Sequence, residues 1–485
     1  MIESSLHSST TIEISSSISQ AFNLINSNNG NNIFVLRNGI FCGSISDGDL
    51  RRAIINGAQL KDSVEKATNF NATFVTLENS NDEVERLFQD KFDFLPVLNS
   101  SKHLIRILKK GEKINIPISE PNLIKRDIEL VLDTLMSSMV SSSGSYVQKF
   151  EENFAEYLGV DPSRVIAVSN GTQALYIALT ILGITNSEVI VPSMTFGATA
   201  NAVIQSNGIP IFADIDSKSW NIDIKKLPQL ISKKTKAIIP VHLYGNPIDM
   251  QELQEFATKH QLTVIEDAAE ALGSKVGGIH VGTDSDASTF SFYGNKTITT
   301  GEGGIVVFKD KSNAERARIF INHGMTKQNR YFHSHWGSNF RLTNMQAALG
   351  CAQLERIELF VNKKIEIKRI YKSKLEPYGC VFTKSLTNAT DSSWLSAFLL
   401  PETNDTNVIE RCISFLLANG IEARRFFLPL DNQPAFSSFR NTRNDISISQ
   451  KVFERGICLP SATSISDAEI NYICSKMIFF LESEK

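Results

Sequence analysis

Short apolar runs alternate with helix-length stretches from Val165 to Val307, and this alternation limits the folds open to the chain. The runs are rich in Val and Ile, as strands buried on both faces are. They include Val189–Val191, Pro210–Phe212, Ala237–Ile239 and Val264–Ile265. Strands that alternate with helices favour a mostly parallel sheet with helices on both faces. We therefore expect an α/β fold with ligands at the carboxyl edge of the sheet.

One lysine, Lys296, lies in the segment Ser291–Gly304, where its neighbours are Phe, Tyr, Thr, Asn and Gly. A lysine in such a pocket can lose its proton and attack a carbonyl group. The alternative is an ordinary solvated charge, because a shifted lysine pKa requires burial. Lys296 is therefore a candidate Schiff-base lysine.

Two further motifs follow strand-like runs. Asp267 ends the run Leu262–Glu266, and pyridoxal phosphate enzymes place an aspartate against the pyridinium nitrogen of the cofactor. Gly171 and Thr172 lie between a strand and a helix, where free amides and the helix dipole favour a phosphate. Each motif alone is also typical of an ordinary helix cap.

Together these three elements resemble the sugar aminotransferases of the DegT/DnrJ/StrS family, which are fold-type I pyridoxal phosphate enzymes. The resemblance runs from about Asn115 to the C-terminus. Within the family, Glu270 and the run Gly294–Gly304 look most like the GDP-perosamine synthases. Trp220–Asp223 and Phe426–Leu430 point the same way. Other segments that resemble the family as a whole are Pro192–Phe196, Pro240–Gly245 and Asn339–Ala348.

The resemblance implies a role for each matching residue. Lys296 would hold pyridoxal 5′-phosphate covalently and later move the proton, and Asp267 would contact the pyridinium nitrogen. Asn339 would reach the cofactor of a neighbouring subunit, so a homodimer or higher homo-oligomer is expected. The other expected cofactor-binding residues are Phe196, which would stack on the ring, Gly171, Thr172 and Ser291 in the phosphate cradle, and Glu270 near the cofactor.

The implied activity is transfer of an amino group from an amino acid, glutamate by expectation, to C4 of a nucleotide-linked 4-keto-6-deoxyhexose. This reaction would serve surface polysaccharide or glycan biosynthesis. The chain departs from the family at Gly337-Ser338, before Asn339, and at Arg424-Arg425, so the nucleotide stays open. Alternatives are a UDP- or dTDP-linked sugar, a dehydratase, or a regulatory protein without activity. The retained Lys296 favours transfer, because dehydratase members carry histidine there.

Bulk properties exclude several classes of protein. The 485 residues suggest more than one domain, and a net charge of −3 gives no basic field for nucleic acid or an anionic membrane. Six scattered cysteines without a Cys-x-x-Cys pair favour a reducing cytoplasm over a zinc site or disulfide framework. No leader, membrane-length apolar stretch or metal-type histidine spacing is evident. A cytoplasmic protein without a metal is expected.

The first 110 residues contain a weak internal repeat of helix and strand. The repeat resembles a tandem CBS module, in which Ser46 and Asp49 would contact an adenine nucleotide. A packing unit without a ligand is the alternative, because this run is also typical of a helix cap. The expected divisions are 1–110 for this module, 111–114 for a linker, 115–372 for a large domain that binds the cofactor and 373–485 for a small α+β domain.

Overall fold

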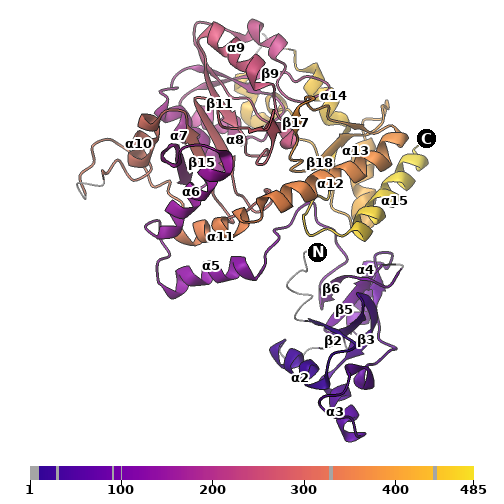
Figure 1. Cartoon of the computed structure of the whole chain (residues 1–485). Helices are drawn as coiled ribbons and strands as arrows, with labels where there is room; N and C mark the ends of the chain where they lie inside the picture. The colour runs from indigo at the N-terminus through magenta and orange to yellow at the C-terminus, as the bar shows by residue number, and fades with distance from the viewer. Residues whose placement is uncertain are drawn as a thin grey trace. The chain divides into compact units, whose positions relative to one another are not determined.

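The computed structural model describes residues 10–28, 32–89, 92–99, 101–326, 331–440 and 445–484 (Figure 1). The chain divides into two compact units. The first comprises Met1–Pro117, Ser414–Glu422 and Ser464–Lys485, and the second comprises Ile118–Ile413 and Ala423–Thr463. No helix in these described ranges has the length and apolar character needed to cross a membrane.

A seven-stranded sheet forms the centre of the second unit. Its strand order is β7 (Val165–Val168), β15 (Gly304–Phe308), β14 (Ala287–Ser291), β11 (Thr263–Asp267), β10 (Thr235–Ile238), β8 (Glu188–Pro192) and β9 (Ile209–Ala213). β15 runs antiparallel to both of its neighbours, and the other paired strands are parallel. The predicted mostly parallel sheet is confirmed.

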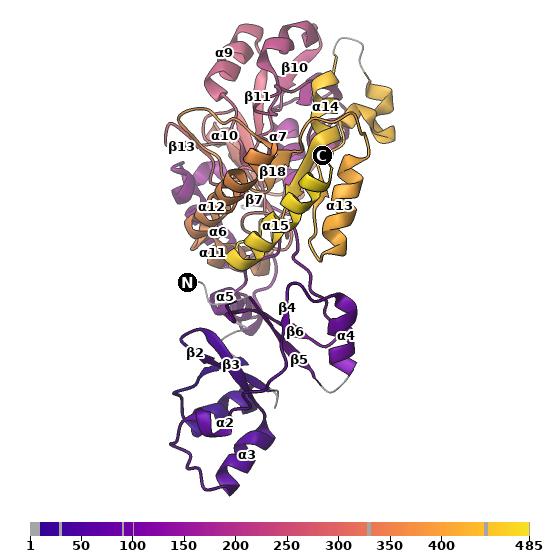
Figure 2. The same cartoon turned by 90° about the vertical axis from the view of Figure 1, so that its right-hand side faces the viewer.

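Helices bury both faces of this sheet, as its Val- and Ile-rich strands require. α7 (Gly171–Ile181), α8 (Ala198–Gln205) and α10 (Lys311–Phe320) contribute to one core cluster. α6 (Ser145–Leu158) and α11 (Asn344–Leu354) contribute to another, where Phe154 meets the rings of Phe290 and Phe292 edge to face at 5.1 and 5.6 Å. α9 (Met250–His260) precedes β11, and the two lie close together in Figure 2.

A smaller antiparallel sheet follows in the order β16 (Val381–Phe382), β18 (Ser396–Leu399), β20 (Gly456–Leu459) and β19 (Arg424–Arg425). The long helix α12 (Ile357–Leu375) packs against β18. α13 (Val408–Ala418) precedes β19, and α14 (Ser447–Arg455) leads into β20. Ile421 forms an isolated bridge with Ile116.

The first unit confirms the internal repeat. One half contains β1 (Thr11–Glu13), α2 (Ile18–Ser27), β2 (Ile33–Arg37), β3 (Ile40–Ile45) and α3 (Asp47–Ile55). The other contains β4 (Val75–Thr76), α4 (Asn81–Gln89), β5 (Phe94–Leu98) and β6 (Leu104–Lys109). In both halves the first strand is parallel to the second, and the second is antiparallel to the third.

The same unit includes α15 (Asp467–Ser483). Arg106 on β6 forms an ion pair with the buried Glu469, which also caps the start of α15. The two halves of the repeat meet through a cluster that contains Phe34, Phe41, Leu98 and Ile107. The identity of the repeat as a CBS module and the expected domain limits stay predictions.

Candidate active site

Lys296 lies in the wall of a cavity of about 1080 Å³ in the second unit. The turn between β14 and β15 carries it, and its main-chain amide donates to the carbonyl of Tyr293 at 2.9 Å. Its Nζ atom is 3.8 Å from the centroid of the Trp394 ring. Burial lowers the pKa of Lys296 below its ordinary value, although Glu270 and Asp267 oppose the shift. The environment therefore favours a neutral, nucleophilic amine.

Asp267 ends β11 and lines the same cavity with only 5% of its surface exposed. Thr199 on α8 donates its hydroxyl to one carboxylate oxygen at 2.8 Å, and the Ala269 amide donates to the other at 3.2 Å. Burial raises the pKa of Asp267, while these two bonds and Lys296 lower it. The two donors fix the carboxylate at the edge of the sheet, where it can accept from a ring N–H.

Gly171 starts α7 directly after β7, and it lines the cavity beside Thr172 and Ser291. A Cβ atom at position 171 would lie 2.8 Å from the Cβ of Ser291, so a larger residue would push this wall into the cavity. Asn170 caps the helix by accepting from the Gln173 amide at 2.9 Å. The helix start therefore combines close backbone approach with the positive end of the dipole, as a phosphate site requires.

Glu270 is buried three residues beyond Asp267 and accepts a hydrogen bond from the Tyr244 amide at 2.9 Å. Burial raises the pKa of Glu270 to about 7, although Lys296 and the Tyr244 amide lower it. Tyr244 holds a left-handed backbone conformation with φ 53°, and its hydroxyl accepts from the Phe427 amide. Tyr244 therefore contacts Glu270 through its amide and Phe427 through its hydroxyl.

Phe196 follows β8 and lines the cavity with 61% of its surface exposed. Its ring centroid is 6.1 Å from that of Phe427. An exposed aromatic face at the mouth of an otherwise buried site is available for stacking on a flat ring.

Seven of the predicted site residues thus line one cavity, namely Lys296, Asp267, Glu270, Gly171, Thr172, Ser291 and Phe196. Asn339 is exposed and does not belong to this lining, and its side-chain oxygen accepts from Arg341 at 2.9 Å. Ser46 and Asp49 lie in the first unit, where they form the capping box of α3. Arg52 adds an ion pair to Asp49 at 2.5 Å.

Three site residues had no assigned role from the sequence: Trp394, Thr199 and Tyr244. Trp394 lies almost 100 residues after Lys296, at the start of the apolar run that forms β18, and nothing in that run indicates a contact with Lys296. Tyr244 belongs to the segment Pro240–Gly245 that resembles the family, and this segment is the one signal that could have found it.

The sequence profile of the DegT/DnrJ/EryC1/StrS aminotransferase family matches residues 121–478, which carry every cavity residue named above. The chain belongs to this family. The family and fold predicted from the motifs are confirmed. The chain is an aminotransferase with pyridoxal phosphate as cofactor, and the Gly171 cradle, the buried Asp267 and Lys296 fit that group.

Individual proteins that are similar to this chain support the same assignment to the family. The chain is 41% identical to the GDP-perosamine synthase of Escherichia coli O157:H7 over 363 residues, which cover 75% of this chain and 97% of that protein. It is 38% identical to the GDP-perosamine synthase of Vibrio cholerae, with 74% and 97% covered. A putative sugar aminotransferase, Spr1654 from Streptococcus pneumoniae in its PLP-form, is similar in structure with a TM-score of 0.72, 26% identity and coverage of 76% and 99%.

The raised pKa of Glu270 predicts a pH-dependent stability. The folded protein binds this proton more tightly than the unfolded chain, whose glutamate titrates near 4.5. Stability from this group is complete below about pH 4.5 and is lost as pH rises through about 7. Glu270→Gln keeps an acceptor for Tyr244 and removes the charge, so it should stabilise the cofactor-free protein by about 3 kcal/mol at pH 8.

Urea unfolding at pH 5 and pH 8 measures this difference, with Glu129→Gln on the exposed side of α5 (Lys125–Met136) as the control. The advantage of Glu270→Gln should shrink at pH 5. An equal effect at both pH values would contradict a raised Glu270 pKa.

Proposed function

We propose that this aminotransferase moves the amino group of glutamate to C4 of a GDP-linked 4-keto-6-deoxyhexose. The meeting of Lys296, Asp267 and the Gly171 helix start in one cavity carries the proposal of transamination. The sugar comes from the relatives, because two that match this chain at 41% and 38% identity are GDP-perosamine synthases. The product would serve polysaccharide biosynthesis.

Each cavity residue has a proposed role. Gly171, Thr172 and Ser291 bind the phosphate of the cofactor, Phe196 stacks on its ring, and Asp267 accepts from the ring N–H. The cofactor supplies an electron sink when its ring nitrogen is protonated. The anionic Asp267 supports that protonation, because Thr199 and the Ala269 amide both donate to it.

Lys296 is the proposed covalent anchor of the cofactor and the carrier of the proton. Burial lowers its pKa from the ordinary lysine value, so the amine releases a proton more readily than an exposed lysine does. Glu270 is the proposed electrostatic partner of this amine. Lys296 lowers the pKa of Glu270, and Glu270 raises the pKa of Lys296.

A dTDP- or UDP-linked sugar is the second candidate for the acceptor. One relative, at 28% identity, is a dTDP-4-dehydro-2,3,6-trideoxy-D-glucose 4-aminotransferase from Saccharopolyspora spinosa. A dehydratase would need no amino group acceptor, so product analysis separates it from a transaminase.

The Lys296→Ala variant should lose multiple turnover, with a fall of several orders of magnitude in rate, because no other group replaces the anchor. The cofactor-loaded wild-type protein is mixed with glutamate and GDP-4-keto-6-deoxymannose, and mass spectrometry follows the amino sugar and 2-oxoglutarate. Retained multiple turnover in the variant would refute the role of Lys296. Wild-type protein that consumes glutamate but yields no amino sugar would move the search to UDP- and dTDP-linked sugars.

A homodimer with a shared active site is the proposed assembly. α5 exposes an apolar row that includes Ile128, Leu132, Leu135 and Met136, and such a row favours a protein partner. Asn339 lies outside the cavity of its own chain, as expected if it serves the cofactor of another subunit.

Mixing two variants that are each impaired tests the shared site. Lys296→Ala and Asn339→Ala dimers should each be impaired, and subunit exchange should restore about a quarter of wild-type activity, because half of the dimers then hold one intact site. Light scattering of Leu132→Asp, with exposed Leu359→Asp as the control, reports the assembly. No recovery after proven exchange would place Asn339 outside the partner's site.

An adenine nucleotide is the proposed ligand of the N-terminal module, at Ser46 and Asp49. The repeated order of strands and helix supports a tandem module. The second half lacks a matching Ser-x-x-Asp after Leu108, so the proposal covers one nucleotide site and not two. ATP or AMP should raise the melting temperature by a few degrees, and Asp49→Asn should remove the shift without loss of the fold. No shift with any adenine nucleotide would leave the helix cap as the role of both residues.

A further inference from the structure

The indole of Trp394 is the aromatic surface against which Lys296 rests. Nζ of Lys296 lies 3.8 Å from the ring centroid, and Nε1 of Trp394 donates to the carbonyl of Asn295 at 2.8 Å. The ring is also stacked on Tyr244, with an interplanar angle of 16° and centroids 6.3 Å apart. Trp394 therefore contacts the amine and the main chain that carries it.

A buried lysine on α12 holds the main chain of Trp394. Lys364 is 2% exposed, and its Nζ donates to the carbonyl oxygens of Trp394 at 3.0 Å and Ser461 at 2.8 Å. Both acceptors are neutral, and burial lowers the pKa of Lys364 to about 7. Among the described residues no carboxylate pairs with Lys364, and a buried ammonium held by carbonyl groups alone is costly compared with an apolar side chain of similar size. Packing alone therefore does not explain a lysine at this position.

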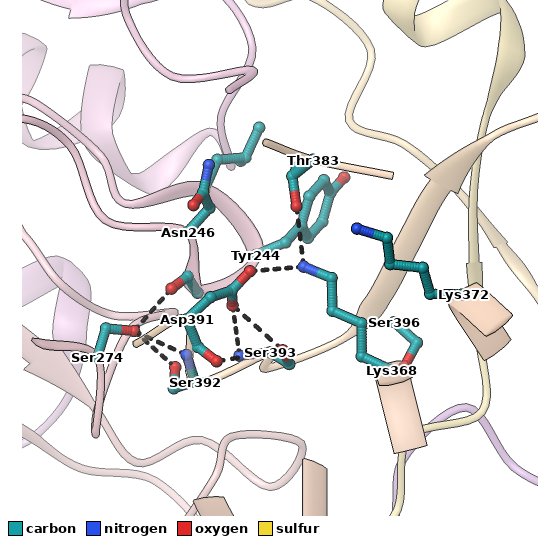
Figure 3. A network of polar contacts seen from close by, with 12 residues as sticks. Tyr244, Asn246, Ser274, Lys368, Lys372, Thr383, Asp391, Ser392, Ser393 and Ser396 are labelled. Carbon is teal, nitrogen blue, oxygen red and sulfur yellow. Dashed lines mark hydrogen bonds and ion pairs between the residues drawn. The ribbon is translucent and has the colours of Figure 1, made fainter. Parts of the chain in front are cut away.

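A second lysine, one turn further along α12, fixes the other end of the same loop (Figure 3). Lys368 pairs with Asp391 at 2.5 Å and donates to Thr383 at 2.8 Å. Oδ1 of Asp391 accepts from the Ser393 amide at 2.7 Å. Residues 391–394 are thus fastened to α12 at both ends.

The middle of this loop is tied to the segment that carries Tyr244. The hydroxyl of Ser274 donates to the carbonyl of Gly245 at 2.6 Å and accepts from the Ser392 amide at 3.1 Å (Figure 3). The two aromatic residues that stack beside Lys296 therefore have linked main chains.

We propose that Lys364 is a positioning residue that holds the Trp394 indole against Lys296 and so fixes the place and proton affinity of that amine. The inference rests on the proposed role of Lys296. Lys364 lines no part of the large cavity, but it borders a void of about 10 Å³ that Lys296 also borders. That space has room for about one water molecule at most, which leaves two ways for Lys364 to act on the amine, through Trp394 or through its charge.

These two ways of acting on Lys296 shift the pKa of its amine in opposite directions. The face of an indole stabilises a cation, so the loss of the indole lowers the pKa of Lys296 where an apolar side chain keeps the amine buried. Removal of a neighbouring positive charge raises it. The other charged groups that line the large cavity are Asp267, Glu270, Glu302, Arg424 and Arg425, and they are unchanged in the variants below.

The test follows the capture of pyridoxal phosphate by the cofactor-free protein as a function of pH, by absorbance. The midpoint of the capture rate reports the Lys296 amine, because only the neutral amine reacts. Trp394→Leu should lower the midpoint by about one pH unit. Lys364→Met should lower the midpoint by a similar amount. The midpoint of the double variant should be no lower than that of Trp394→Leu alone, because both substitutions remove the same contact between the indole and Lys296.

Lys372→Met is the matched control, because Lys372 is a half-exposed lysine on the same helix that pairs with Glu376. It should leave the midpoint unchanged. If Lys364→Met does not fold, Asp391→Asn releases the other end of the loop and should lower the midpoint in the same direction, while Lys364→Arg should restore most of the wild-type value.

A raised or unchanged midpoint in Lys364→Met, or additive shifts in the double variant, would overturn the inference. Lys296→Ala separates this failure from that of the proposed function. If capture persists in Lys296→Ala, the proposed role of Lys296 is wrong. If capture is lost there but Trp394→Leu and Lys364→Met behave as wild type, only the positioning inference is wrong.

Discussion

Desolvation of three ionisable groups in one cavity is the constraint on which the site depends. Burial lowers the pKa of Lys296 and raises those of Asp267 and Glu270, so water exclusion brings the proton affinities of an amine and two acids closer together. The attraction between opposite charges opposes each of these shifts. Groups that are close in proton affinity can exchange a proton with little change in free energy, as proton shuttling requires.

The parallel sheet fixes the positions of these buried groups. Asp267 ends β11, while Gly171 and Lys296 lie just beyond β7 and β14, so buried main-chain hydrogen bonds fix the starting point of each loop. A buried pair, His242 and Glu266, stabilises the end of β11. Glu266 accepts from Nε2 of His242 at 3.0 Å, while the Ile248 amide donates to Nδ1 at 3.1 Å, so the imidazole ring is held from both sides. His242 then donates its own amide to the carbonyl of Asp267.

The wall opposite the sheet is built differently. Trp394 comes just before β18 and Phe427 just after β19. Two lysine side chains from α12 hold the loop that carries Trp394. Lys364 and Lys368 point from one face of α12, because residues four apart lie one above the other on a helix. The arrangement makes α12 a structural link between the smaller sheet, through β18, and the aromatic residues beside Lys296.

The sequence by itself determined the sheet, the helices on its faces and the residues at the strand ends. Lys296, Asp267 and Gly171 were predictable because each follows a strand with a local signal, and parallel strands bring their carboxyl ends to one edge. The internal repeat near the N-terminus was predictable because its helices and strands also show in the local pattern of apolar residues.

Only the tertiary structure decided the partners of these residues. Lys364 lies in a helix with several other lysines, and nothing local separates the buried one from the exposed Lys372. Trp394 meets Lys296 across almost 100 residues of chain, through packing that depends on the whole unit. The elevated pKa of Glu270 also depends on that packing, because burial arises from contacts between distant segments and not from the order of neighbouring residues.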